Sequence, residues 1–209
     1  MTTQTTPTTE LEAVNVIIGT IGEAPISSLS NISLTDAILA YSLLQQVCRQ
    51  TLAKGWMFNN EKEYPLAADV NGEVFLPTNT IQFNVSRSMG GQVDGVYRGG
   101  RIYDRENHTF TISKTVYVDI TFALSFEDCP EAFRWFVTMR AARMFLDRTV
   151  GNVQMDGFAA RDESDAWDTL VRMEGETAQY NILTDNPSVY STLDRWSLNP
   201  GGGGQFIVQ

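Results

Sequence analysis

The sequence has 209 residues, of which 43% are hydrophobic, and it carries a net charge of -10. A chain of this length and composition can bury enough surface to fold without disulfides or a metal. Its acidic balance argues against a protein that wraps DNA or docks on an anionic membrane, because both need clustered Lys and Arg. Cys48 and Cys129 form no disulfide framework and residues 1–9 hold no signal peptide, so we expect a reducing compartment. No apolar run reaches about 18 residues, and no membrane span is expected.

The first quarter of the chain has the pattern of two helices. Thr9 and Glu12 form a capping-box pattern at the start of a helix predicted over residues 10–21, which Gly22 ends. A longer stripe of apolar residues at helical spacing predicts a second helix over residues 35–54. The short connection between the two helices favours antiparallel neighbours.

The middle of the chain, residues 56–126, has the pattern of short strands. Residues 73–77 and 81–86 are β-rich runs separated by turn residues. Arg98–Arg101, with two central glycines, predicts a hairpin turn. Residues 116–124 alternate between apolar and polar side chains, which is typical of a strand in a half-buried antiparallel sheet.

Helical periodicity returns in the last third of the chain. Asp128 and Glu131 form a second cap pair at the start of a helix that Gly151 ends. A further helix is predicted over residues 156–180. The side chains expected to face inward on this last helix are Phe158, Ala166, Leu170 and Met173.

The expected fold class is therefore α+β. Residues 10–55 and 127–183 form an antiparallel helical bundle with two N-terminal and two C-terminal helices. Residues 56–126 form a β-rich domain inserted between the two halves of the bundle. Residues 1–9 are expected to be flexible, and residues 184–209, which include four consecutive glycines, form an extended tail.

The last two helices carry opposite charge. Residues 131–155 contain four Arg and two acidic residues, whereas residues 156–180 contain two Arg and seven acidic residues. Packed side by side, such helices would attract each other. Exposed ion pairs are worth at most about 1 kcal/mol each, so we expect two solvated charged faces instead.

The sequence contains little that could support catalysis. The single histidine, His108, lies in an expected hairpin loop, and the glycines at 90–91 and 99–100 do not form a phosphate-binding loop. Glu163 and Asp165 are the candidate carboxylate pair for glycoside hydrolysis. That chemistry needs one buried carboxyl group, and both are expected to be exposed. We therefore predict no catalytic residue, no cofactor and no metal site.

Contacts between proteins are the more plausible use of the distinctive side chains. We expect Trp56 and Phe58 to pack with aromatic residues at the start of the third helix, Phe133, Trp135 and Phe136. The short apolar end of the tail could dock on a neighbouring chain by strand addition or could be a frayed terminus. The interface candidates are Trp56, Phe58, Arg140, Arg143, Asp165, Asp168, Phe206, Ile207 and Val208.

Six short motifs occur in a fixed order over most of the chain. They are residues 13–15 with 21–25 and Leu29, residues 54–59, residues 98–100 with 102–105, residues 126–131, residues 140–145 and residues 180–183. Together they resemble the tail tubular protein A family of short-tailed bacteriophages, also called head–tail adaptors or gatekeepers. The resemblance covers about residues 10–183 and does not include residues 201–209.

The resemblance implies a non-enzymatic role in the virion tail, after synthesis in the host cytoplasm. Members of the family form a ring, taken to be dodecameric, below the portal protein. The ring joins the portal to the tail nozzle, tail tubular protein B, and offers a seat for the tail fibre. DNA passes through the ring without specific binding. We expect the C-terminal helix and tail to meet the portal and the β-rich insert to meet the nozzle and fibres.

Two other functions remain open from the sequence. The chain could be a tail-associated polysaccharide hydrolase that uses Glu163 and Asp165. It could also carry a carbohydrate-binding module in the β-rich insert, which would require an exposed row of aromatic side chains.

Overall fold

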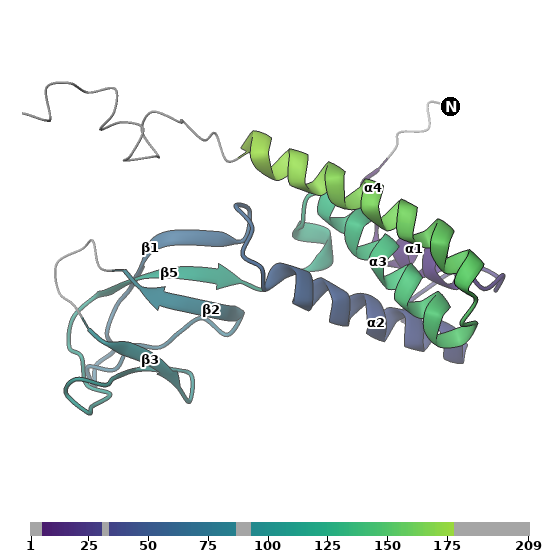
Figure 1. Ribbon diagram of the computed structural model, residues 1–209. Helices are drawn as coiled ribbons and strands as arrows, with labels where there is room; N and C mark the ends of the chain where they lie inside the picture. Colours follow the sequence, from purple (N-terminus) through teal and green to yellow (C-terminus); the bar gives the residue numbers. More distant parts are fainter. Residues whose placement is uncertain (1–5, 31–33, 87–92, 178–209) are drawn as a thin grey trace, which may run out of the picture. The chain divides into compact units, whose positions relative to one another are not determined.

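The computed structural model describes residues 6–30, 34–86 and 93–177, except for the side chain of Val153. In this part the chain is a mixed α+β protein, as predicted (Figure 1). The helices are α1 (Glu10–Gly19), α2 (Thr35–Leu52), α3 (Glu131–Thr149) and α4 (Val153–Thr177). None of the helices described combines the length and the hydropathy that a membrane crossing requires.

The two N-terminal helices follow the predicted ranges closely. The Thr9 hydroxyl oxygen caps α1 by accepting a hydrogen bond from the Glu12 amide at 3.2 Å. The helix ends two residues earlier than predicted, and the hydroxyl of Thr20 donates to the Ile17 carbonyl there at 2.6 Å. The second helix also ends two residues early, at Leu52.

The predicted cap of the third helix is wrong. Asp128 ends a short 3₁₀ helix, η1 (Phe126–Asp128), and its carboxylate accepts a hydrogen bond from the Ser125 hydroxyl at 2.6 Å. Pro130 occupies the cap position of α3, where it offers no side-chain acceptor. The carboxylate of Glu131 instead accepts hydrogen bonds from the amide and hydroxyl of Thr8, at 2.8 and 2.6 Å. These bonds tie the segment before α1 to the start of α3.

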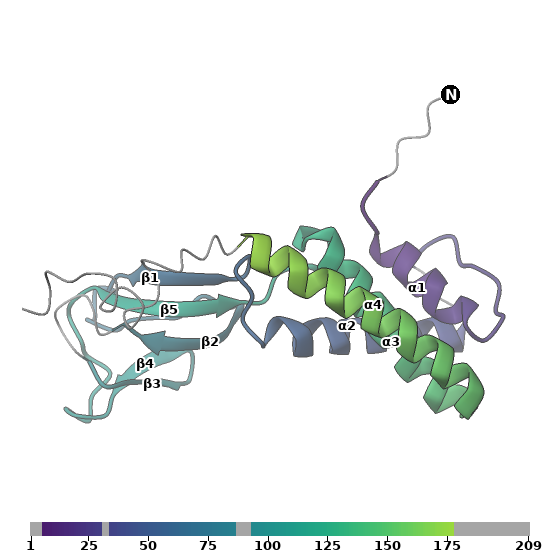
Figure 2. The same ribbon diagram turned by 45° about the horizontal axis from the view of Figure 1, so that its top comes forward.

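The helices share one core of buried side chains. Its residues come mainly from the apolar stripes expected on the helices. Helices α2, α3 and α4 lie alongside one another (Figure 2). Ala166 and Leu170 bring α4 into this core, and Met173 packs at its edge. Phe158 is 68% exposed, so its predicted inward position is wrong. Around the axis of α4, Phe158 lies roughly a third of a turn away from the face that carries Glu163, Ala166 and Leu170. That face is the one turned toward α3.

The strands form an antiparallel sheet and a separate hairpin. The sheet has the order β1-β5-β2, with β1 (Asn60–Leu66), β5 (Val116–Phe122) and β2 (Thr80–Val85). The hairpin pairs β3 (Gly95–Arg98) with β4 (Arg101–Asp104), and Gly99 and Gly100 form its turn at positive φ. The predicted turn and the central strand are therefore confirmed.

One expected strand is absent, and one observed strand was not predicted individually. Residues 73–77 make only isolated bridges, Glu73 with Thr111 and Phe75 with Arg101, and form no regular strand. In contrast, β1 was not predicted. A bulge between Glu61 and Tyr64 breaks its pairing with β5, so the alternation that identifies a strand is missing from its sequence.

The strand region has its own cluster of buried side chains. Its members are Leu66, Val74, Leu76, Val93, Ile102, Val116, Val118 and Ile120. The helical core and this cluster share no buried residue. The proposed domain boundaries of the bundle and the insert remain a prediction.

Candidate interaction surfaces

An aromatic cluster lies where α2 leads into the strand region. Trp56 is buried, and its indole nitrogen donates to the Thr51 carbonyl oxygen at 2.8 Å. The Trp56 ring meets the Phe133 ring edge to face, with centroids 6.3 Å apart. The Phe58 ring also meets the Phe133 ring edge to face, with centroids 5.2 Å apart. The expected packing of Trp56 and Phe58 against the start of α3 is thus present at Phe133, whereas Trp135 is 42% exposed and its expected place in this cluster is wrong. Trp56 is buried, so its side chain shapes this junction.

Trp167 of α4 completes the cluster, although the sequence did not single it out. Its ring lies 5.8 Å from that of Trp56 and 5.0 Å from that of Phe136, measured between centroids. The spacing Glu163, Trp167, Leu170 places it on the side of α4 that faces α3. That spacing was the signal that could have identified it.

Asn59 is a buried polar residue that joins α2 to the sheet. Its side-chain oxygen accepts from the Trp56 amide at 2.7 Å. Its side-chain nitrogen donates to the carbonyl oxygens of Leu52, at 3.0 Å, and Phe122, at 2.9 Å. The side chain is 2% exposed and has both polar atoms satisfied. Nothing in the local sequence pattern marks this role.

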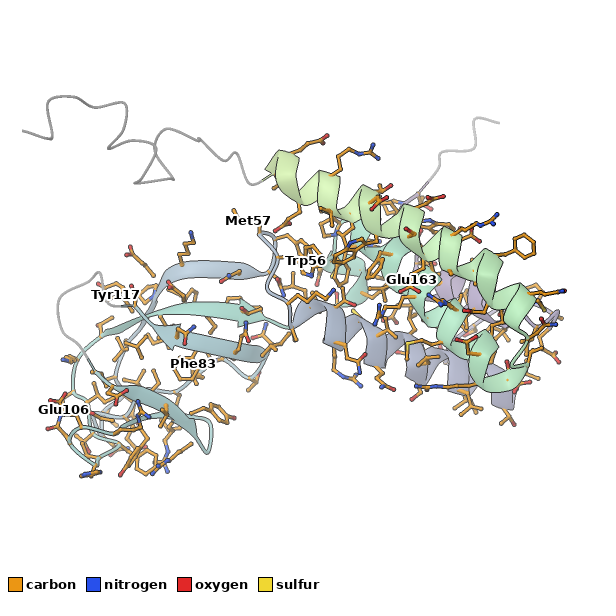
Figure 3. All side chains as sticks on the ribbon, in the orientation of Figure 1. Trp56, Met57, Phe83, Glu106, Tyr117 and Glu163 are labelled. Atoms are coloured by element: carbon orange, nitrogen blue, oxygen red, sulfur yellow. The ribbon has the colours of Figure 1, made fainter. Side chains whose placement is uncertain are left out.

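Three ion pairs connect α3 to α4. One carboxylate oxygen of Glu163 lies 2.9 Å from a guanidinium nitrogen of Arg140, and the other lies 3.0 Å from a guanidinium nitrogen of Arg143. Arg143 also binds Asp156 at 2.6 Å. Its hydrogen bonds to Asp156 and then Glu163 raise the pKa of the Arg143 guanidinium above its usual value. Figure 3 shows Glu163 on the α3 side of α4.

The prediction of two solvated charged faces is therefore wrong. The Glu163 side chain is only 15% exposed, and a guanidinium can bind two carboxylates at fixed geometry, so these pairs are more than loose surface contacts. Asp165 lies two positions further on and is exposed. Residues two apart on a helix point to different faces, so Glu163 and Asp165 do not form the carboxylate pair expected of a hydrolase.

One flank of the α3–α4 pair holds an acidic groove. Its volume is about 510 Å³, and its lining combines Trp135 and Met139 of α3 with Asp162, Asp165, Ala166 and Thr169 of α4. Trp135 is 42% exposed there. We call this surface the acidic flank. It contains Asp165, one of the predicted interface residues.

The other flank of the same helix pair is basic. A groove of about 320 Å³ is lined by Lys54, Phe136, Arg140, Ser164 and Trp167, together with the Arg143–Glu163 ion pair. The Lys54 ammonium lies 4.2 Å from the centre of the Trp167 ring. Burial, and secondly the charge of Arg140, lower the pKa of Lys54 below its usual value. We call this surface the basic flank.

The remaining candidates are scattered. Asp168 is exposed on α4, and Phe206, Ile207 and Val208 lie outside the described residues. His108 is exposed in its loop at positive φ, as expected for a turn residue. Within the described ranges, no group of three or more His, Cys, Asp or Glu side chains is placed to hold a metal ion.

Comparison with known proteins gives a consistent result. The chain is 30% identical over 167 residues to tail tubular protein A of Klebsiella phage KP34, which covers 79% of this chain and 86% of that protein. The model of a family described as tail tubular protein matches residues 11–180, which include all five strands and all four helices except Glu10, the first residue of α1. The chain therefore belongs to the tail tubular protein family.

Proposed function

We propose that this chain is the head-to-tail adaptor of a short-tailed phage. In this role it forms a ring between the portal protein and the tail nozzle, tail tubular protein B, and provides a seat for the tail fibre. The observation that carries the proposal is the family match over residues 11–180, because it spans both the helices and the strands. A match of this extent indicates that the chain shares the whole architecture of the family, and with it a function, and not only a local motif.

The charge of the chain supports a ring through which DNA passes. A net charge of -10 disfavours tight binding to the phosphate backbone, which requires a continuous basic surface. An acidic lumen repels the phosphate backbone, so DNA can slide during packaging and ejection. We propose that the exposed acids of α4, Asp165 and Asp168 among them, face this lumen or a neighbouring subunit.

The arrangement of the α4 carboxylates also fits a structural role better than it fits a hydrolase. Both oxygens of Glu163 are engaged by Arg140 and Arg143, which leaves Glu163 unsuited to donate a proton to a glycosidic oxygen. We expect no turnover of capsule or peptidoglycan in a zymogram of the purified protein. Clearing by the wild-type chain, and its loss on replacement of Asp165, would favour the hydrolase.

Native mass spectrometry with and without the portal tests the adaptor directly. The account predicts a complex in which many copies of this chain join one portal ring, with twelve copies expected from the family resemblance. The free chain alone can be smaller. A portal preparation that binds no copy of the chain at any ratio would contradict the proposal.

A further inference from the structure

The two flanks of the α3–α4 pair differ in charge but resemble each other in form. On the acidic flank, Asp162 and Asp165 border the exposed ring of Trp135. On the basic flank, Lys54 and Arg140 border the ring of Trp167. Each flank is therefore a shallow aromatic groove with charges of a single dominant sign beside it.

Helix geometry places the two grooves on opposite sides of the seam between α3 and α4. Trp135 and Met139 are one turn apart on α3, and Phe136 and Arg140 are one turn apart on a face about 100° away. Residues of the seam itself, such as Glu163 and Leu170, lie between the corresponding faces of α4. A copy of the protein can therefore present both flanks to two different neighbours.

The charges on both flanks are incompletely matched within the chain. Among the residues that the structure describes, the ion pairs of this region join Arg140 and Arg143 to Glu163 and Asp156. These pairs leave Asp162, Asp165 and Lys54 without a partner of opposite charge in the described part of the chain. Burial, and secondly the like charge of Arg140, lower the pKa of Lys54, so its ammonium would gain from an acidic partner.

We propose that the acidic flank of one copy of this protein binds the basic flank of the next copy. The Lys54 ammonium would then approach Asp162 and Asp165, while the apolar faces of Trp135 and Trp167 are covered together. Because the two flanks are different surfaces, the contact is head-to-tail, and its repetition closes into a ring when the rotation between copies permits. The inference rests on the proposed ring and names the surfaces that build it.

Charge reversal in the full-length protein tests the contact. Asp165→Lys makes the acidic flank more basic, and Lys54→Glu makes the basic flank more acidic. Each variant alone then brings like charges together at every contact. We expect each to weaken self-association by at least about tenfold, measured by analytical ultracentrifugation up to millimolar concentration. Wild-type association should itself weaken as salt rises.

Restoration of assembly makes the test specific. The variant that combines both reversals, and an equimolar mixture of the two single variants, each bring opposite charges together again and should regain association. Glu61→Lys and Lys62→Glu are the matched controls, because they make the same charge changes at exposed positions outside both grooves. They should associate as the wild type does.

Several results would overturn the proposed contact. These are a wild-type chain that stays monomeric at millimolar concentration, single reversals no weaker than their controls, or no recovery in the mixture. A Lys54→Glu variant that keeps self-association but loses affinity for a double-stranded DNA fragment would assign the basic flank to DNA instead. If any of these results is obtained while the chain is still found in purified tails, the proposed contact is refuted and the adaptor role is not. Absence of the chain from the tails refutes the adaptor.

Discussion

Replacement of Glu163 by Gln examines the ion-pair network between α3 and α4. The change keeps the size of the side chain and removes its charge, so Arg140 loses its ionic partner and Arg143 keeps only Asp156. A hydrogen bond to a charged group contributes about 1.5–3 kcal/mol. Arg140 and Arg143 are 43% and 33% exposed and can regain water, and Gln can still accept one bond, so the low end applies. We expect a loss of about 1.5 kcal/mol in the free energy of unfolding.

The measurement is urea denaturation followed by circular dichroism and tryptophan fluorescence. For a chain of this length the loss corresponds to a fall in Tm of roughly 3–6 °C. Asp168→Asn is the control, since it removes a charge from an exposed position of the same helix and should change stability by less than about 0.5 kcal/mol. A double-mutant cycle with Arg143→Gln should give a coupling of about 1 kcal/mol. Equal effects of Glu163→Gln and the control, or a coupling near zero, would refute the network as a source of stability.

Three further outcomes follow from the same structure. Asn59→Ala removes three buried hydrogen bonds and should destabilise the protein by about 2–4 kcal/mol in urea, whereas Asn60→Ala, at an exposed neighbour, should have almost no effect; a similar small loss at both would contradict the buried link. Leu170→Ala should cost about 2–5 kcal/mol by thermal melting and the exposed Val171→Ala less than about 1, and the reverse order would show that α4 packs through another face. The pKa of Asp104 lies below its usual value, chiefly through the hydrogen bond from the Asn107 side chain, so its contribution to stability is present above about pH 4 and lost as the pH falls through the lowered pKa. Asp104→Asn should therefore decline less than the wild type between neutral and strongly acidic pH, and parallel curves would show that this carboxylate does not contribute.

Elements with local periodicity were predictable from the sequence. The apolar stripe of α2 and the alternation of β5 each follow from one face of the element being buried, and the structure places both close to the predicted ranges. The Thr9 cap and the glycine turn between β3 and β4 are likewise decided by neighbouring residues.

Elements that depend on distant partners were not predictable in this way. Strand β1 has a polar sequence, and its position comes from pairing with β5 more than 50 residues later, across a bulge. The start of α3 takes its side-chain partner from Thr8, so the local pair Asp128 and Glu131 was misleading. A capping pattern indicates that a helix begins nearby, but it cannot reveal that a distant segment supplies the hydrogen bonds.

The same distinction applies to the interaction surfaces. Arg140 and Arg143 were predicted as interface residues, and the opposite charges of the two helices were visible in the sequence. That these charges pair depends on the burial of Glu163, and burial depends on packing. Asp165 was identified together with Glu163, yet the helix directs these two side chains to different surroundings. The place of Trp135 and Lys54 in the two grooves could not be predicted, because the fold sets each beside charged residues from another part of the chain.

The central claim, that this chain works by assembly between head and tail, is tested most directly by cryo-electron microscopy of the phage particle that encodes it. The account predicts a ring of this chain between the portal and the nozzle, with α3 and α4 of each copy against its neighbours. Density at that position that belongs to another protein, or particles complete without this chain, would contradict the account.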